Sequence, residues 1–242
     1  NQMFSLPTFL WFRKYKPEVI EKADKYFLFG DYITYMLSGE RAIDPPTASR
    51  TMFFDALNLK WSEEIAACFN LPIEKFSKVV KIGSMVGKIR ASLAKETGLS
   101  EDTYIIMGCH DQVAASLGSG AVSEGDIMAG EGSTESINLV IGKNSISEKF
   151  MDYQLCYEPY IEPGLYMTSV AQLTHATCIR WFVHNFGADF GEVEDIPGES
   201  IYERADRGCA KDSGNVFFLP YLSGVNCMDA SDVALGGFLG VD

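Results

Sequence analysis

An acidic residue, Asp111, lies shortly after a short apolar segment of the chain that ends at a glycine. The segment, Tyr104 to Met107, predicts a buried strand, and Gly108 ends it. Gln112 to Leu117 has the composition of a helix that stops at Gly118. An acid at such a switch from strand to helix lies where α/β proteins keep their ligands, and the helix N-terminus favours its ionised form. Asp111 is therefore a candidate general base, and the alternative is a residue that only caps the helix.

The neighbours of Asp111 can contact the same ligand. Gln112 carries both donor and acceptor groups, which suits the hydroxyl of a polyol, and its alternative is a solvent-facing position on the helix. His110 either contacts the substrate or forms part of the pocket wall. The other two histidines, His175 and His184, do not have the spacing of a metal site.

A second candidate site is the tripeptide Gly132, Ser133 and Thr134. It lies between an apolar segment that begins at Asp126 and another from Ile137 to Ile141, and this pattern predicts a β-hairpin. The tip of such a hairpin can direct backbone N–H and hydroxyl groups at a phosphate. The same residue types also fill ordinary hairpin turns, so the tripeptide alone does not decide. Its position shortly after the acidic residue favours phosphate binding.

The rest of the chain predicts helices and strands that would hold these residues in place. Helices are expected at Leu6 to Tyr15, Pro17 to Lys25, Asp31 to Gly39, after Trp61 and Ser62, at Ala91 to Thr97, Gln172 to Phe186 and Ile201 to Ala210. Strands are expected at Gly164 to Ala171 and, buried, at Asn215 to Leu219, with a turn at Asp44 to Thr47 and an acidic loop at Asp189 to Gly198.

Composition excludes several classes of protein. The 242 residues carry a net charge of −13, which argues against nucleic-acid binding, because that binding depends on Lys and Arg neutralising phosphates. ATP is not excluded, since local N–H groups and Mg²⁺ can hold it. No apolar segment approaches the roughly 20 residues that span a bilayer. The six scattered cysteines favour free thiols in a reducing cytoplasm over disulfides or zinc.

The segment around Asp111 also resembles a known family. Gly108-Cys109-His110-Asp111-Gln112, with Ala114-Ala115 and Gly118-Ser119-Gly120, is similar to the "G-x-x-D, two small residues, G-x-G" segment of the FGGY carbohydrate kinases. The hairpin tip at 132–134 stands where that family has Gly-Thr-Ser or Gly-Thr-Gly. Further similar blocks lie at Leu6 to Gly39, Asp44 to Asp55 and Phe218 to Gly224, so the resemblance covers nearly the whole chain.

The resemblance implies an α/β fold of the actin-like, ribonuclease H-like kind, with two domains around a cleft. It implies ATP-dependent phosphorylation of a sugar or polyol with Mg²⁺, as in xylulose, glycerol and gluconate kinases. Asp111 would be the catalytic base, His110 and Gln112 would bind substrate with it, and Gly132, Ser133 and Thr134 would bind the ATP phosphates. No residue is assigned as a metal ligand. A non-catalytic actin-like module that binds nucleotide or sugar is the alternative.

The same resemblance predicts how the chain is divided. Residues 1–122 would form the C-terminal part of an FGGY N-terminal domain and residues 123–242 the beginning of the C-terminal domain. The chain would be an internal piece of a longer cytoplasmic protein and inactive alone. We expect Val122 to Gly125 to act as a hinge, tested by Gly125→Pro. No membrane or nucleic-acid partner is expected, a homodimer is compatible with the sequence, and the sugar is not specified.

Overall fold

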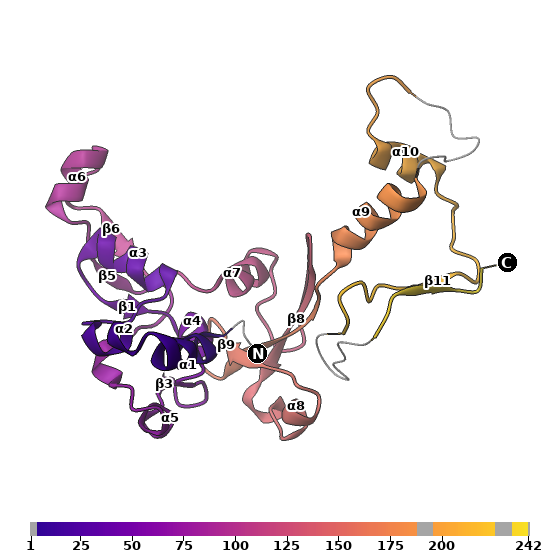
Figure 1. Cartoon of the computed structure of the whole chain (residues 1–242). Coiled ribbons are helices and arrows are strands. Elements are labelled where there is room, and N and C mark those ends of the chain that lie inside the picture. The colour runs from indigo at the N-terminus through magenta and orange to yellow at the C-terminus, as the bar shows by residue number, and fades with distance from the viewer. Residues whose placement is uncertain (1–3, 188–195, 226–233, 242) are drawn as a thin grey trace. The chain divides into compact units, whose positions relative to one another are not determined.

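The computed structural model describes residues 4–187, 196–225 and 234–241 (Figure 1). The chain divides into two compact units. The first unit comprises Asn1–Asp126, Leu139–Ile146 and Tyr157–Thr168. The second comprises Ile127–Asn138, Ser147–Cys156 and Ser169–Asp242. The expected loop at 189–198 and Cys227 lie wholly or largely outside the described residues.

The helices of the described residues are α1 Ser5–Tyr15, α2 Pro17–Lys22, α3 Phe29–Ser38, α4 Pro45–Ser49, α5 Glu63–Cys68, α6 Ala91–Thr97, α7 Asp111–Gly118, α8 Lys149–Asp152, α9 His175–Phe186 and α10 Ile201–Gly208. Short 3₁₀ turns lie at Ile73–Lys75 and Lys143–Ser145. Among the described residues, no helix is both long enough and apolar enough to cross a membrane.

The strands are β1 Ala42–Ile43, β2 Phe54–Asp55, β3 Lys60–Trp61, β4 Lys78–Val79, β5 Met85–Lys88, β6 Tyr104–Ile106, β7 Ile127–Glu131, β8 Glu135–Gly142, β9 Tyr157–Pro159, β10 Leu165–Gln172, β11 Phe217–Leu219 and β12 Gly237–Leu239. The largest sheet has the order β7-β8-β10-β9, and the remaining strands form pairs. β1 pairs with β4 in parallel, whereas β2–β3, β5–β6, β9–β10 and β11–β12 are antiparallel.

Local signals set the ends of several helices. Ser62 accepts the N–H of Ile65 and so caps α5. Gly39 and Gly98 adopt φ values of +87° and +76°, which end α3 and α6 in the left-handed conformation that glycine adopts without strain. The helix expected at Ala91 to Thr97 is therefore confirmed with both of its bounds.

Two acidic residues act differently from the sequence prediction. Asp31 does not precede α3 but lies in its first turn, where its side chain accepts the N–H of Leu28 at 2.7 Å. The turn expected at Asp44 to Thr47 is instead the beginning of α4. Asp44 caps this helix by accepting the N–H of Thr47, and Pro45 takes the first helical position, which needs no N–H partner.

An aromatic cluster forms the main core of the first unit. Tyr26, Phe53, Leu71 and Phe76 are buried at its centre, and Phe9, Ile65, Phe69 and Trp61 pack around them. The rings of Trp61 and Phe76 are 4.8 Å apart, and the Trp61 indole N–H donates to the carbonyl of Ser77 at 2.9 Å. This bond satisfies the one polar group of the indole inside an apolar environment.

Strand β6 is less buried than the sequence predicts. Tyr104 and Ile106 of β6 are 57% and 54% exposed, although the apolar segment suggested a buried strand. β6 pairs with β5 in a two-stranded sheet, so the expectation of full burial is wrong for the described residues. The same holds for Phe217 of β11, which is 66% exposed. Apolar composition indicates a strand, but burial depends on what covers its two faces.

The expected hinge is a hydrogen-bonded turn of the first unit. The Asp126 carboxylate accepts the N–H groups of Val122 and Ser123, each at 2.8 Å. Gly125 has a φ of +93°, and its N–H donates to Val140 at 2.9 Å. Proline can neither adopt this φ nor donate that hydrogen bond, so Gly125→Pro would disrupt the turn itself. The hinge and the effect of Gly125→Pro on turnover stay predictions.

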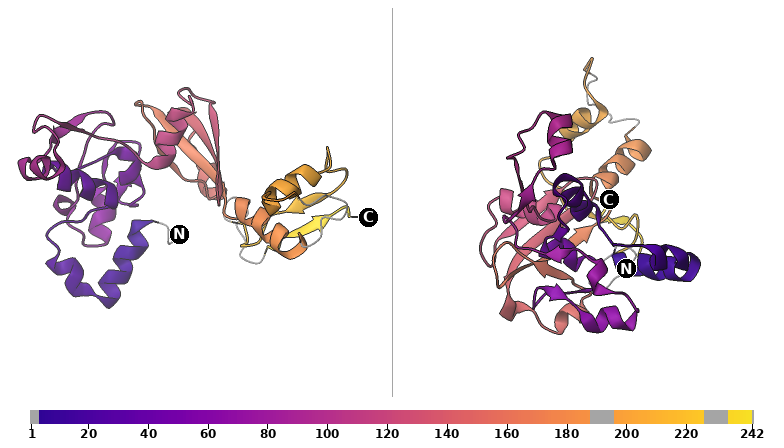
Figure 2. Two further views of the ribbon diagram at one scale, coloured as in Figure 1. Left: turned by 90° about the horizontal axis from the view of Figure 1, so that it is seen from above. Right: turned by 90° about the vertical axis from the view of Figure 1, so that its left-hand side faces the viewer.

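The second unit has its own aromatic core. α9 packs on the antiparallel pair of β11 and β12 (Figure 2). Trp181 stacks on Phe218 at 6.3 Å, and Phe218 stacks on Phe238 at 4.7 Å. α10 lies beside α9 and begins with a capping box between Ser200 and Glu203. These elements confirm the helices expected near Gln172 to Phe186 and Ile201 to Ala210.

Candidate active site

The predicted general base lies at the first position of α7. Asp111 has an 84% exposed side chain, and the backbone of His110 is the N-cap of the helix. The His110 side chain makes no capping hydrogen bond there. Asp111 is therefore available to a ligand, while the N-terminus of α7 favours its negative charge. The half-buried Gln112 follows it within the same turn.

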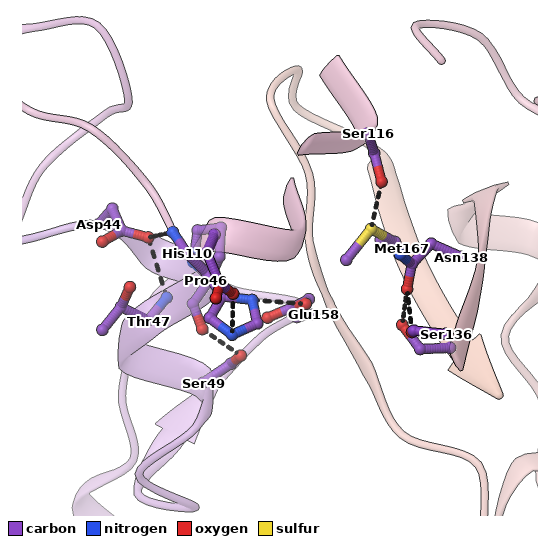
Figure 3. A network of polar contacts seen from close by, with 12 residues as sticks. Asp44, Pro46, Thr47, Ser49, His110, Ser116, Ser136, Asn138, Glu158 and Met167 are labelled. Atoms are coloured by element: carbon purple, nitrogen blue, oxygen red, sulfur yellow. Dashed lines mark hydrogen bonds and ion pairs between the residues drawn. The ribbon is translucent and has the colours of Figure 1, made fainter. Parts of the chain in front are cut away.

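A buried acid holds the backbone at the entry to α7. Asp44 is 6% exposed, and its Oδ1 atom accepts the N–H of Thr47 at 2.9 Å and the N–H of His110 at 3.4 Å (Figure 3). Burial raises the pKa of Asp44 above its usual value, and the hydrogen bonds from Thr47 and His110 oppose that rise. One carboxylate thus joins the beginning of α4 to the residue before Asp111.

The His110 ring lies between two carboxylates. Its Nε2 atom is 3.2 Å from Asp111 Oδ1. Its Nδ1 atom is 3.2 Å from Glu158 Oε1 on β9 (Figure 3). The Glu158 side chain is only 6% exposed, and that of His110 is 20% exposed. The contact between Nδ1 and Oε1 is an ion pair without the alignment of a hydrogen bond, and Glu158 Oε2 is buried with no hydrogen-bond partner among the described residues.

These charges determine the protonation of His110. Burial acts to lower the pKa of the imidazole, but the Glu158 carboxylate raises it more. Arg50 acts against this rise and Asp111 adds to it, so the net effect is a raised pKa. A protonated imidazole has an N–H on each nitrogen and can serve both carboxylates, whereas the neutral ring can donate to only one.

Glu158 was not found from the sequence. It lies in Tyr157-Glu158-Pro159, between apolar neighbours, and is a charged side chain on an otherwise buried strand. Buried Glu residues are rare unless they are paired, and a charged residue between apolar neighbours is the one signal that the sequence offers. Asp44 belongs to a block that resembles the family, but its contact with His110 depends on the fold.

The phosphate candidate forms the tip of a hairpin in the second unit. Gly132, Ser133 and Thr134 connect β7 to β8 and are exposed, which confirms the predicted hairpin. The Gly132 N–H donates to the Thr134 carbonyl at 3.0 Å, and the Gly132 carbonyl accepts the N–H of Ala176 in α9 at 3.2 Å. The tip is thereby fixed to the first turn of α9, with the Ser133 and Thr134 side chains at the surface. Their contact with phosphate stays a prediction.

A cavity of about 620 Å³ lies beside this tip, entirely within the second unit. Ser133 of the tip, Thr177 and Arg180 of α9 and Tyr202 of α10 line it, together with two acids of α10, Glu203 and Asp206. Its volume is in the range of small-molecule sites. Hydroxyl groups and a guanidinium fit a phosphorylated ligand, because both donate to phosphate oxygens.

A dedicated metal cage is not part of the described chain. Within residues 4–187, 196–225 and 234–241, no three His, Cys, Asp or Glu side chains are grouped as metal ligands. Such a cage is not needed for Mg²⁺ in a kinase, because this ion is commonly held by one or two carboxylates, waters and the substrate phosphates.

Comparisons with known proteins define the class of this fold. A xylulose kinase structure from Lactobacillus acidophilus superposes with a TM-score of 0.83 at 21% identity, covering 99% of this chain and 46% of that one. The fold is that of the actin-like sugar kinases.

The sequence comparisons specify the family. Residues 1–118 match the "FGGY family of carbohydrate kinases, N-terminal domain". A xylulose kinase of Staphylococcus epidermidis is 25% identical over 240 residues, 98% of this chain and 46% of its own length. An autoinducer-2 kinase of Yersinia enterocolitica is 27% identical over 187 residues, 76% of this chain and 34% of its own length. Residues 1–118 thus belong to the N-terminal domain of the FGGY family of carbohydrate kinases. The chain spans about half the length of the first of these relatives.

Proposed function

We propose that the intact protein containing this chain transfers the γ-phosphoryl group of ATP to a hydroxyl of a sugar or polyol. The observation that carries this proposal is the exposed Asp111 carboxylate at the first position of α7, whose backbone Asp44 anchors through His110. Membership of a carbohydrate kinase family supports it. Xylulose, glycerol, gluconate and autoinducer-2 kinases are the named relatives, and the substrate belongs to the same chemical class.

Asp111 would orient the acceptor hydroxyl and take its proton. Phosphoryl transfer proceeds through a loose transition state, so little proton transfer is needed early and alignment contributes more than basicity. The negative charge that the helix N-terminus favours is the form that accepts a proton. Gln112 offers donor and acceptor groups to a second hydroxyl, and His110 forms the wall behind the acid.

Gly132, Ser133 and Thr134 would hold the ATP phosphates, with Arg180 in the adjoining cavity. Mg²⁺, held through those phosphates, would neutralise the charge that develops during transfer. Asp111 is in the first unit and the tip is in the second. We place the protein in the cytoplasm, where ATP is available. We expect no nucleic-acid or membrane partner, and the proposal is compatible with a homodimer. We propose that the boundary between the two domains lies near residue 122.

A coupled assay of ADP release by the intact protein tests the proposal against glycerol, pentuloses, hexuloses and gluconate. The expected result is ADP production that requires both one of these acceptors and Mg²⁺. Binding of ATP or sugar without ADP production in the presence of any acceptor would instead support the non-catalytic binding module. We further expect the 242-residue chain alone to be inactive, because in-line transfer requires both reactants to be held together. Acceptor-dependent ADP production by this chain would contradict that expectation.

A further inference from the structure

We propose that Glu158 is a positioning residue for Asp111 and acts through His110 in an acid–imidazole–acid relay. This inference rests on the proposed role of Asp111 as the base. The relay comprises three residues of the first unit: Glu158 on β9, His110 before α7, and Asp111 at the beginning of α7. Glu158 lies outside the sequence blocks that resemble the family.

The relay connects the interior of the unit to its surface. Exposure rises from 6% for the Glu158 side chain through 20% for His110 to 84% for Asp111. Each of the two contacts spans 3.2 Å, one to Nδ1 and one to Nε2 of the same ring. Contacts on both nitrogens limit rotation of the imidazole, so a fixed ring presents Nε2 to one oxygen of the Asp111 carboxylate. The other Asp111 oxygen remains available for a hydroxyl.

A purely structural origin does not account for Glu158. A buried carboxylate is costly unless it is paired and hydrogen-bonded, and Glu158 Oε2 has no hydrogen-bond partner among the described residues. An apolar side chain of similar volume is often equal or better for stability at such a position. We therefore assign the Glu158 carboxylate a role through His110, the one ionisable side chain that it contacts in the described ion pairs.

The relay needs a protonated imidazole, because only that form has N–H groups for both carboxylates. The charged groups that face His110 are Glu158 from β9, Asp111 from α7 and Arg50 from the end of α4, while Asp44 accepts its backbone N–H. The two flanking acids retain the proton and Arg50 opposes it. During the reaction the hydroxyl proton passes to Asp111 and His110 keeps its own protons. Orientation of Asp111 is lost when pH rises through the pKa of His110.

The test compares Glu158→Gln with the unchanged protein in two measurements. NMR titration of the His110 ring, assigned with His110→Gln, should show its pKa lowered by about one unit, because an opposite charge within about 4 Å is removed. The turnover number should fall about tenfold, as for other supporting groups behind a functional side chain, with KM for ATP unchanged and the alkaline loss of activity moved to lower pH. Glu158→Asp should restore part of both effects.

Glu162→Gln is the matched control, since it makes the same substitution at an exposed position shortly after β9. This control substitution should leave the pKa of His110 unchanged. A His110 titration that does not respond to Glu158→Gln in a folded variant would overturn the relay, whether or not the protein is a kinase. A shifted titration with unchanged turnover and pH profile would show that the pair is structural and positions nothing. Absence of activity towards every acceptor would contradict the proposed function itself, and a His110 titration unaltered by Asp111→Asn would then separately overturn the relay.

Discussion

The Asp44 carboxylate accepts the backbone N–H of His110 across 66 positions of sequence, and the same oxygen caps α4 through Thr47. This is how a block near residue 44 and a block near residue 110 become parts of one site. The carboxylate is acceptor-only when ionised, so one Oδ1 atom serves two donors without competition from a proton. Loss of Asp44 therefore affects helix stability and the entry to α7 together.

Asp44→Ala should lower both the stability of the first unit and the turnover of the intact protein. Loss of an N-cap costs about 1 kcal/mol, and the N–H of His110 loses its acceptor as well. Asp44→Asn keeps an acceptor oxygen and should therefore retain most of the stability and most of the turnover. Ser62→Ala provides the comparison, because it removes the cap of α5 without contacting His110. Urea unfolding and ADP release measure the two effects, and equal turnover losses in Asp44→Ala and Ser62→Ala would contradict a role for Asp44 at the site.

Asp111→Asn should lower turnover of the intact protein by at least about 10²-fold, within the range attributed to general acid–base groups. The KM for the sugar should change much less, because the amide keeps the shape and part of the hydrogen bonding. Asp102→Asn is a suitable control, since the Asp102 side chain is also 84% exposed and pairs with Lys88 at 2.8 Å. A variant with near-normal turnover at position 111, measured by ADP release at saturating substrate, would end the assignment of the base.

Asp31 should make the first unit less stable as pH rises. Burial raises its pKa to about 6, although hydrogen bonds from Ser77 and Leu28 oppose the rise. Between the unfolded value of about 3.9 and this folded value, the folded state holds a proton that the unfolded state releases. The Asp31 contribution to the free energy of unfolding is thus fully present below about pH 4 and is lost by about pH 6, a change on the order of 2–3 kcal/mol.

Urea unfolding at pH 4, 5 and 7 of the wild-type chain and of Asp31→Asn measures this contribution. Asparagine keeps an acceptor for Leu28 and does not titrate, so the stability difference between the two chains should shift in favour of the variant as pH rises. Other carboxylates act equally in both chains and cancel. A difference that is constant across the three pH values would show that the pKa of Asp31 is the same in the folded and unfolded states.

Cys109 should react slowly with alkylating agents even though it is only half-buried. Burial, then the charges of Asp44 and Glu158, raise the pKa of its thiol to about 11. Because the thiolate is the reactive form, iodoacetamide at pH 8 should modify Cys109 at least about tenfold more slowly than the exposed Cys68, as measured by peptide mass spectrometry. Asp44→Asn should increase the Cys109 rate and leave that of Cys68 unchanged. Equal rates for the two cysteines in the native chain would contradict the prediction.

The sequence predicts elements whose ends are set locally. Ala91–Thr97 is confirmed because Gly98 ends it, and the hairpin around Gly132 is confirmed because apolar segments flank a short turn of small residues. Asp31 was placed near the correct helix start but before the first turn rather than within it, and Asp44 was expected in a turn although it caps α4. A side chain that can cap from several positions does not specify one of them.

Features that depend on distant packing could not be predicted. β6 has an apolar sequence, yet Tyr104 and Ile106 are exposed because burial follows from neighbouring strands rather than from composition. The turn at Val122 to Gly125 looked like a linker, since the acceptor of the Gly125 N–H is Val140 on another segment. Glu158 was missed for the same reason. Only the fold brings β9 against His110, and no spacing along the chain indicates that contact.

Each unit contains a tryptophan in a different environment, and this gives the protein two natural optical reporters. Trp61 is packed against Phe76 and bonded to Ser77 in the first unit, whereas Trp181 is stacked on Phe218 in the second. Trp11 is 51% exposed and can be replaced by phenylalanine. Fluorescence of chains that retain only Trp61 or only Trp181 would then follow the melting of each unit separately. Comparison of the two unfolding curves, one from each variant, would reveal whether the units lose their structure in one cooperative transition or in sequence.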